Sequence, residues 1–236
     1  MNIVDWIILG IIGVSVLFGL YKGFINAVLG LAGVFLALVI AYSTYPNLAQ
    51  SLRDNESLVR TLIHYSDASS RIHDLDLALT SVDSLPPQLL DEVLSRASLP
   101  EPFDAFVRTN VAGKVFQPLG STTISEYLNQ TIIAVSLNIL CFLASFGIAY
   151  AAIMLLVHLI GYVFRMPVLK HFDLILGGIF GGVRGIFLVF VIFALLPILL
   201  TISPIDQLSQ AVAESQLAGI FYRANLIQSI MQGTLF

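Results

Sequence analysis

Residues 18–24, FGLYKGF, decide how the first part of this chain folds, because they interrupt a long run of apolar residues. A helix of about 40 apolar residues would measure about 60 Å, roughly twice the hydrocarbon core of a membrane. The chain must therefore turn within this stretch. Gly19 and Gly23 permit the positive φ angle that a tight reversal needs, and Lys22 can place its ammonium group among lipid headgroups. We interpret Lys22 as an interfacial anchor at the turn of a helical hairpin.

The composition of the chain is that of an integral membrane protein. Of its 236 residues, 57% are hydrophobic and 11% are charged, whereas soluble domains carry about 25% charged residues. The net charge of −4 argues against a nucleic-acid partner, because phosphate binding requires clustered lysine and arginine side chains. The single cysteine, Cys141, excludes an intrachain disulfide and any paired-cysteine redox or zinc motif.

Four apolar stretches are long enough to cross a bilayer as helices, and they predict an all-α membrane protein with about four transmembrane helices. Before the third stretch, Thr123 and Glu126 have the spacing of a capping box, which marks a helix start. The four stretches are residues 3–21, 24–45, 131–164 and 174–203. They divide the chain into a transmembrane hairpin (1–45), an intervening segment (46–130), spans 3 and 4 (131–203) and a tail (204–236).

The intervening segment 46–130 differs in character from the spans, since its eleven acidic and six basic residues give it a charge of −5. Apolar residues recur at helical spacing within it, which predicts short amphipathic helices. Two such stripes are Leu89, Leu90, Val93 and Leu94, and then Phe103, Phe106, Val107 and Val111. The tail 204–236 has the same amphipathic pattern, and we expect one or two surface helices with a break at Gly219.

The orientation of the chain follows from the basic residues in the short connections between spans. Lys22 lies between spans 1 and 2, and Arg165 and Lys170 lie between spans 3 and 4. Because short basic loops stay in the cytoplasm, we expect both connections on that side. The N-terminus, the segment 46–130 and the C-terminal tail are then extracytoplasmic.

Residues 180–186, FGGVRGI, repeat the pattern of the first motif inside the fourth span. Arg184 follows Asp173 by eleven residues, or about 16 Å of helix, which would place it near the middle of the bilayer. A guanidinium group at that depth is usually paired or faces a polar interior. Alternatively, residues 174–182 form a short re-entrant segment, and the true span begins at Gly185.

The second motif has two interpretations. Its glycines predict close helix packing, and Arg184 predicts a functional polar site. Gly177, Gly181 and Gly185 are spaced by four residues, and this small-xxx-small pattern is typical of closely packed membrane helices.

Two polar residues lie inside the third span. His158 could relay protons or pair with Asp173, or it could be a neutral side chain that hydrogen-bonds a neighbouring helix. Asn138 predicts a hydrogen bond between helices.

Taken in order, the motifs resemble the colicin V production (CvpA-like) family of bacterial inner-membrane proteins. The residues that carry the resemblance are Asp5, Gly19, Lys22 and Gly23, and later the run Asp173-Leu174-Ile175-Leu176-Gly177-Gly178-Ile179-Phe180-Gly181-Gly182-Val183-Arg184-Gly185. The resemblance implies a small multi-pass protein of the inner membrane that supports toxin (bacteriocin) production or export and envelope homeostasis. It implies no catalytic residue and no cofactor.

Three functions are compatible with these features. We expect a non-enzymic protein whose partners are the lipid bilayer and either another protein or a second copy, reached through residues 46–130 and the tail. The alternative is a small transporter or channel with a polar path around Arg184 and His158. A membrane enzyme has the least support, because the chain lacks HExxH and GxSxG motifs and metal-ligand spacings.

Overall fold

The computed structural model describes residues 1–55, 57, 61, 72, 74–97, 99, 103–161, 170–202 and 206–223. These residues are helical throughout, apart from turns and one isolated antiparallel bridge between Ser81 and Thr123. The chain forms two compact units. Unit 1 comprises residues 1–48, 140–195 and 206–229, and unit 2 comprises residues 49–139, 196–205 and 230–236.

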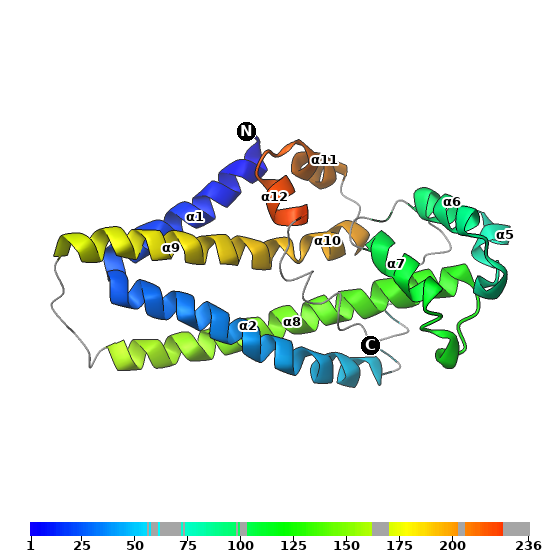
Figure 1. Ribbon diagram of the computed structural model, residues 1–236, viewed down its shortest axis with the longest axis horizontal. Helices are drawn as coiled ribbons and strands as arrows, with labels where there is room; N and C mark the ends of the chain where they lie inside the picture. Colours follow the sequence, from blue (N-terminus) through cyan, green and yellow to red (C-terminus); the bar gives the residue numbers. More distant parts are fainter. Residues whose placement is uncertain are drawn as a thin grey trace. The chain divides into compact units, whose positions relative to one another are not determined.

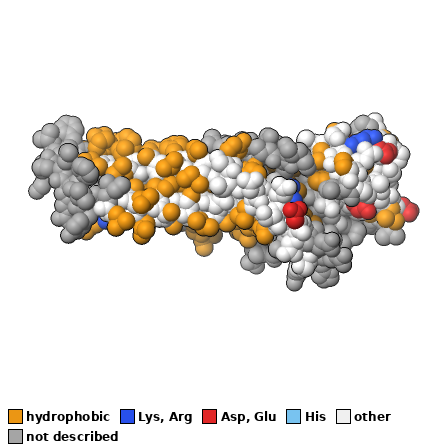
Figure 2. Space-filling view, turned by 90° about the horizontal axis from the view of Figure 1, so that it is seen from below, with side chains coloured by type: hydrophobic (Ala, Val, Ile, Leu, Met, Phe, Trp, Pro, Cys, Tyr) orange, Lys and Arg blue, Asp and Glu red, His pale blue; other side chains and the backbone are white. Residues whose placement is uncertain are grey.

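Four helices are long and apolar enough to cross a membrane, which confirms the predicted set of spans (Figure 1). They are α1 (Ile3–Lys22), α2 (Phe24–Arg53), α8 (Ile124–Gly161) and α9 (Lys170–Phe193). Many of their large apolar side chains are exposed to the surroundings, including Ile3, Val14, Leu155 and Ile175. Figure 2 shows such side chains spread over the surface of the long helices. A surface of this kind suits lipid as the solvent.

The second and third spans have different boundaries from those predicted. Helix α2 continues through Pro46 to Arg53, because a proline removes one backbone hydrogen bond and need not end a long helix. Helix α8 begins at Ile124, and its predicted capping box is confirmed. The Glu126 carboxylate accepts the Thr123 amide at 3.1 Å, and the Thr123 hydroxyl accepts the Glu126 amide at 3.4 Å.

Helix α9 runs without interruption from Lys170 to Phe193, so the re-entrant alternative for residues 174–182 is wrong. The break lies further on, at Ala194 and Leu195, and α10 (Leu196–Ile202) follows it. Pro197 explains the position of the break, because it has no amide hydrogen to donate to the carbonyl of Phe193. Arg165, one of the three cations used to predict orientation, lies outside the described residues.

Unit 2 is built from short helices around an apolar core. After α5 (Leu75–Ala78) and the 3-10 helix η1 (Val82–Ser84) come α6 (Pro87–Ala97), α7 (Phe103–Ala112) and the 3-10 helix η2 (Gln117–Leu119). Helices α6 and α7 contain the two apolar stripes of the sequence. Val93, Leu94, Val107 and Val111 from these stripes are buried in one cluster with Ile124 and Leu128 of α8.

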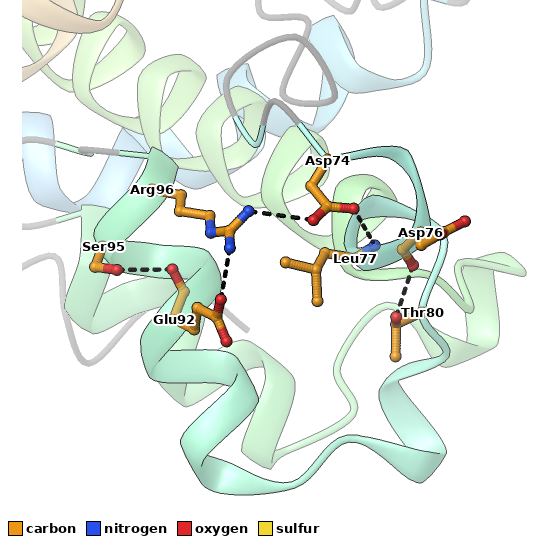
Figure 3. Close-up of polar contacts among 7 residues, drawn as sticks. All are labelled: Asp74, Asp76, Leu77, Thr80, Glu92, Ser95 and Arg96. Carbon is orange, nitrogen blue, oxygen red and sulfur yellow. Dashed lines mark hydrogen bonds and ion pairs between the residues drawn. The ribbon is translucent and has the colours of Figure 1, made fainter.

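Charged side chains on the surface of unit 2 are largely paired. Arg96 of α6 contacts Asp74 at 3.1 Å and Glu92 at 2.7 Å, while Asp74 also accepts the amide of Leu77 at the start of α5 (Figure 3). Lys114 contacts Asp83, and this hydrogen bond raises the pKa of the lysine. Pairs this exposed contribute about 1 kcal/mol or less each.

The described part of the tail forms α11 (Asp206–Glu214) and α12 (Ala218–Arg223). Gly219 lies inside α12, so the predicted break at this glycine is wrong. The chain turns earlier, at residues 215–217, where the Ser215 hydroxyl accepts the Ala218 amide at 2.9 Å and starts the new helix. Phe221 of α12 packs against Phe190 and Phe193 of α9.

Candidate functional site

The two sequence motifs meet at the turn between α1 and α2. Gly23 ends α1 with a φ of 82°, in the region that favours glycine. Asp173, in the first turn of α9, accepts the amide of Phe24 at 2.8 Å. It therefore caps the start of α2 from another helix. A Cβ on Gly23 would lie 2.3 Å from a carboxylate oxygen of Asp173, so a larger residue would displace this cap.

Away from the turn, α1 and α9 run antiparallel, and they cross in close contact at the motif glycines. A Cβ on Gly19 would lie 2.1 Å from the carbonyl oxygen of Gly177, and one on Gly181 would lie 2.5 Å from that of Ser15. The Ser15 hydroxyl donates to the Gly181 carbonyl at 2.7 Å. Gly185 extends the crossing, since its Cβ would lie 3.0 Å from the Cα of Ile12. The motif glycines thus let two backbones touch, as small residues do in membrane helix pairs.

Asp5 holds the tail against the first helix. Its side chain is fully buried, and it accepts hydrogen bonds from the Ser215 hydroxyl at 2.5 Å and the Leu217 amide at 3.0 Å. It also accepts the amide of Asn2 at 2.8 Å, which completes a capping box at the start of α1. Figure 1 shows α11 and α12 beside this end of α1. Sequence reasoning missed Ser215, although a serine three residues before an apolar helical run is an N-cap signal.

Arg184 lies where all four spanning helices approach one another. Its guanidinium carbon is 5.3 Å from the centre of the Phe18 ring on α1 and 5.8 Å from that of the Tyr150 ring on α8. A Cβ on Gly30 of α2 would lie 3.3 Å from Arg184 Nη1. Within the described part of the chain, Arg184 Nε and the Tyr150 hydroxyl are buried without hydrogen-bond partners. Aromatic faces thus stabilise this cation. Sequence reasoning missed Tyr150, because no local pattern links it to Arg184.

Lys22 contacts the same aromatic ring as Arg184. Its ammonium nitrogen is 5.6 Å from the centre of the Phe18 ring, and its side chain is exposed. Phe18 precedes Lys22 by four residues, or about 6 Å of helix. Gly30, which approaches Arg184 Nη1, follows Gly23 by seven residues, so the guanidinium group lies about 10 Å, or two helical turns, from the hairpin. The depth of Arg184 in the bilayer stays a prediction. An arginine side chain in a helix points back toward the N-terminus, and here the guanidinium group lies over the Phe18 ring.

A groove runs along α1 and α9 from Arg184 and Phe18. It has a volume of about 480 Å³, and Ile7, Ile11 and Val14 of α1 and Leu188 of α9 form apolar walls. Of the described residues that line it, Arg184 alone carries a charge. Gly10 also lines the groove, and a Cβ on this residue would meet no atom within 4 Å.

His158 and Asn138, the polar residues of α8 singled out in the sequence, show no contact with Arg184 among the described residues. His158 is exposed, and its Nδ1 lies 2.8 Å from the carbonyl oxygen of Met154 in its own helix. A hydrogen bond from His158 to a neighbouring helix and a pairing with Asp173 stay predictions. Asn138 does bond between helices, because its side-chain oxygen accepts from Arg53 at 2.8 Å. Among the residues that the structure describes, no three His, Cys, Asp or Glu side chains group as a metal site requires.

Comparison with known proteins places both motifs in one family. The sequence profile described as colicin V production protein matches residues 4–73 and 109–225. A curated relative, the colicin V production protein homolog of Haemophilus influenzae, is 42% identical over 55 residues, which are 23% of this chain and 34% of the relative. The aligned part of the chain thus spans about a third of that relative's length. No solved structure matches significantly. Because the profile covers most of the chain and both motifs, this multi-pass inner-membrane protein belongs to the colicin V production protein family.

Proposed function

We propose that this protein is a non-enzymic structural component of the inner membrane that supports toxin production or export and envelope homeostasis. The colicin V production family is not a known enzyme family. The observation that carries the proposal is that the motif residues in the spans make contacts between helices. Asp5 and Asp173 accept hydrogen bonds from the starts of other segments, and the glycines join α1 to α9. These side chains hold helices together, which supports a structural role for the motifs.

Unit 2 is the part that we expect to engage a protein partner. Its helices α6 and α7 carry exposed charged residues over a buried apolar core, as a stable domain outside the bilayer would. A deletion of residues 56–121, replaced by a short glycine-serine linker, leaves α2 and the capped start of α8 intact. We expect the truncated protein to insert into the membrane at the normal level and to lose complementation of toxin secretion in a deletion strain.

The matched control is the full chain with Lys114→Gln, which removes one exposed ion pair of unit 2, that with Asp83, and lies outside α6 and α7. It should complement normally. Full complementation by the truncated protein, at equal abundance in the membrane, would show that unit 2 is not needed and would refute this part of the proposal.

The side of the membrane that unit 2 occupies can be tested separately. Asp76 is exposed, whereas the native Cys141 is buried. A cysteine introduced by Asp76→Cys should react with a membrane-impermeant maleimide in intact spheroplasts, and the wild type should not. Labelling that requires lysis would place unit 2 in the cytoplasm and reverse the proposed orientation.

A transporter or channel has less support from this arrangement. A polar path through Arg184 and His158 would need groups that connect them, and His158 instead bonds to its own helix. We therefore expect Arg184→Leu to lower toxin secretion only as far as it lowers the amount of folded protein in the membrane. A loss of solute flux into liposomes with Arg184→Leu, restored by Arg184→Lys, would favour transport instead.

A further inference from the structure

The two motif cations have no counter-ion in the described part of the chain. No salt bridge to Lys22 or Arg184 occurs among the described residues, and Arg184 Nε is buried without an acceptor. Asp173, at the same end of α9, is occupied by the Phe24 amide. Charged groups within a membrane are normally paired. The arrangement therefore favours binding of an anion by the two cations that lie near the Phe18 ring.

The groove beside Arg184 defines what kind of molecule carries that anion. Its volume of about 480 Å³ falls within the range of small-ligand pockets, about 300–1,000 Å³. Ile7 and Phe18 line it eleven residues apart on α1, so it extends for about 16 Å along the helix. The walls are apolar and belong to membrane-spanning helices. An occupant that matches these features has one negative group and a long apolar chain.

We infer that this site binds one anionic phospholipid, with its phosphate at Arg184 and Lys22 and an acyl chain in the groove between α1 and α9. The guanidinium fork matches two phosphate oxygens, and the ammonium group adds a second positive charge. Lys22 is the last residue of α1 before the hairpin, so we expect the phosphate on the hairpin side of the bilayer. This inference goes beyond the proposed function and does not depend on a role in toxin production.

A carboxylate on another protein's transmembrane helix is the competing occupant, and the structure favours the lipid. A second copy of this chain offers Asp5 and Asp173, but both already accept hydrogen bonds from other segments. The open groove also faces the region in which lipid is the solvent. Basic pockets between transmembrane helices are known to bind anionic headgroups.

Native mass spectrometry of the purified full chain can measure this binding. Phosphatidylglycerol and phosphatidylcholine are titrated separately, and the dissociation constant of the first bound lipid is compared. We expect the wild type to bind phosphatidylglycerol at least about tenfold more tightly. Arg184→Gln should lose most of that preference, and Lys22→Gln should weaken phosphatidylglycerol binding about fivefold.

Two further variants separate lipid binding from damage to the fold. Gly10→Leu fills open space in the groove, so it should weaken binding of both lipids without destabilising the protein. Arg108→Gln removes an exposed cation of unit 2 and should change neither constant. Equal affinities of the wild type for the two lipids, or an unchanged preference in Arg184→Gln, would overturn the inference. Either result would leave the complementation test of the proposed function unaffected.

Discussion

The helix crossing gives the sharpest test of this structure, through the substitution Gly19→Ala. The added Cβ would lie 2.1 Å from the carbonyl oxygen of Gly177, about 1.3 Å inside the 3.4 Å of ordinary contact, and 3.0 Å from the Cα of Gly181. All these neighbours are backbone atoms, so no side-chain rotation relieves the overlap. Helices α1 and α9 must separate, which would also break the hydrogen bond from Ser15 to Gly181. We expect a loss of about 3 kcal/mol in the free energy of unfolding.

The matched control is Gly10→Ala on the same helix, because a Cβ at Gly10 meets no atom within 4 Å. Alanine favours helix, so this variant should be as stable as the wild type or up to about 1 kcal/mol more stable. Unfolding by SDS in mixed micelles, followed by circular dichroism, measures both variants. Equal unfolding free energies for Gly19→Ala and Gly10→Ala would show that α1 and α9 do not touch at Gly19, and the assigned crossing would be wrong.

Three further substitutions test the capping interactions. Asp173→Ala removes the acceptor of the Phe24 amide and should cost about 1 kcal/mol in the same assay, with Asp173→Asn retaining most of the stability. Asp5→Ala leaves the buried Ser215 hydroxyl without its acceptor and so loosens the tail from α1. Limited proteolysis should therefore cleave the tail about tenfold faster in Asp5→Ala than in Asp5→Asn. Glu126→Ala should cost about 1 kcal/mol, whereas the exposed Glu92→Ala should cost less than about 0.5 kcal/mol.

Local signals in the sequence predicted much of this fold. Hydrophobic length alone defined four spans, and the Thr123–Glu126 spacing marked the start of α8 to within a residue. Both signals depend on interactions within a few residues. Helix α2 continues past the predicted apolar stretch 24–45 to Arg53, because hydrophobic length locates the part of a helix that can cross a membrane and not the end of the helix.

The candidate site was less predictable, because its contacts join distant segments. Asp5 and Ser215 are 210 residues apart, and Tyr150 reaches Arg184 from a different helix. The position of the Arg184 charge was hard to predict for another reason. Counting residues along α9 locates the Cα atom, but the charge lies at the end of a long side chain that points back along the helix.

The two aspartates share a physical device that stabilises a carboxylate at the start of a helix through amide and hydroxyl groups. Each lies in the first turn of its own helix, where the helix dipole contributes about half a positive charge. Asp173 also accepts from the first residue of α2, which brings a second helix N-terminus to the same carboxylate. Two such termini supply about one positive charge, and Asp5 gains the Leu217 amide and Ser215 hydroxyl in a similar way. Because both aspartates are compensated by amide and hydroxyl groups, Lys22 and Arg184 are not consumed in neutralising them. The cations of the repeated motif are therefore available, on one face of Phe18 or the other, for an anion from the surrounding membrane.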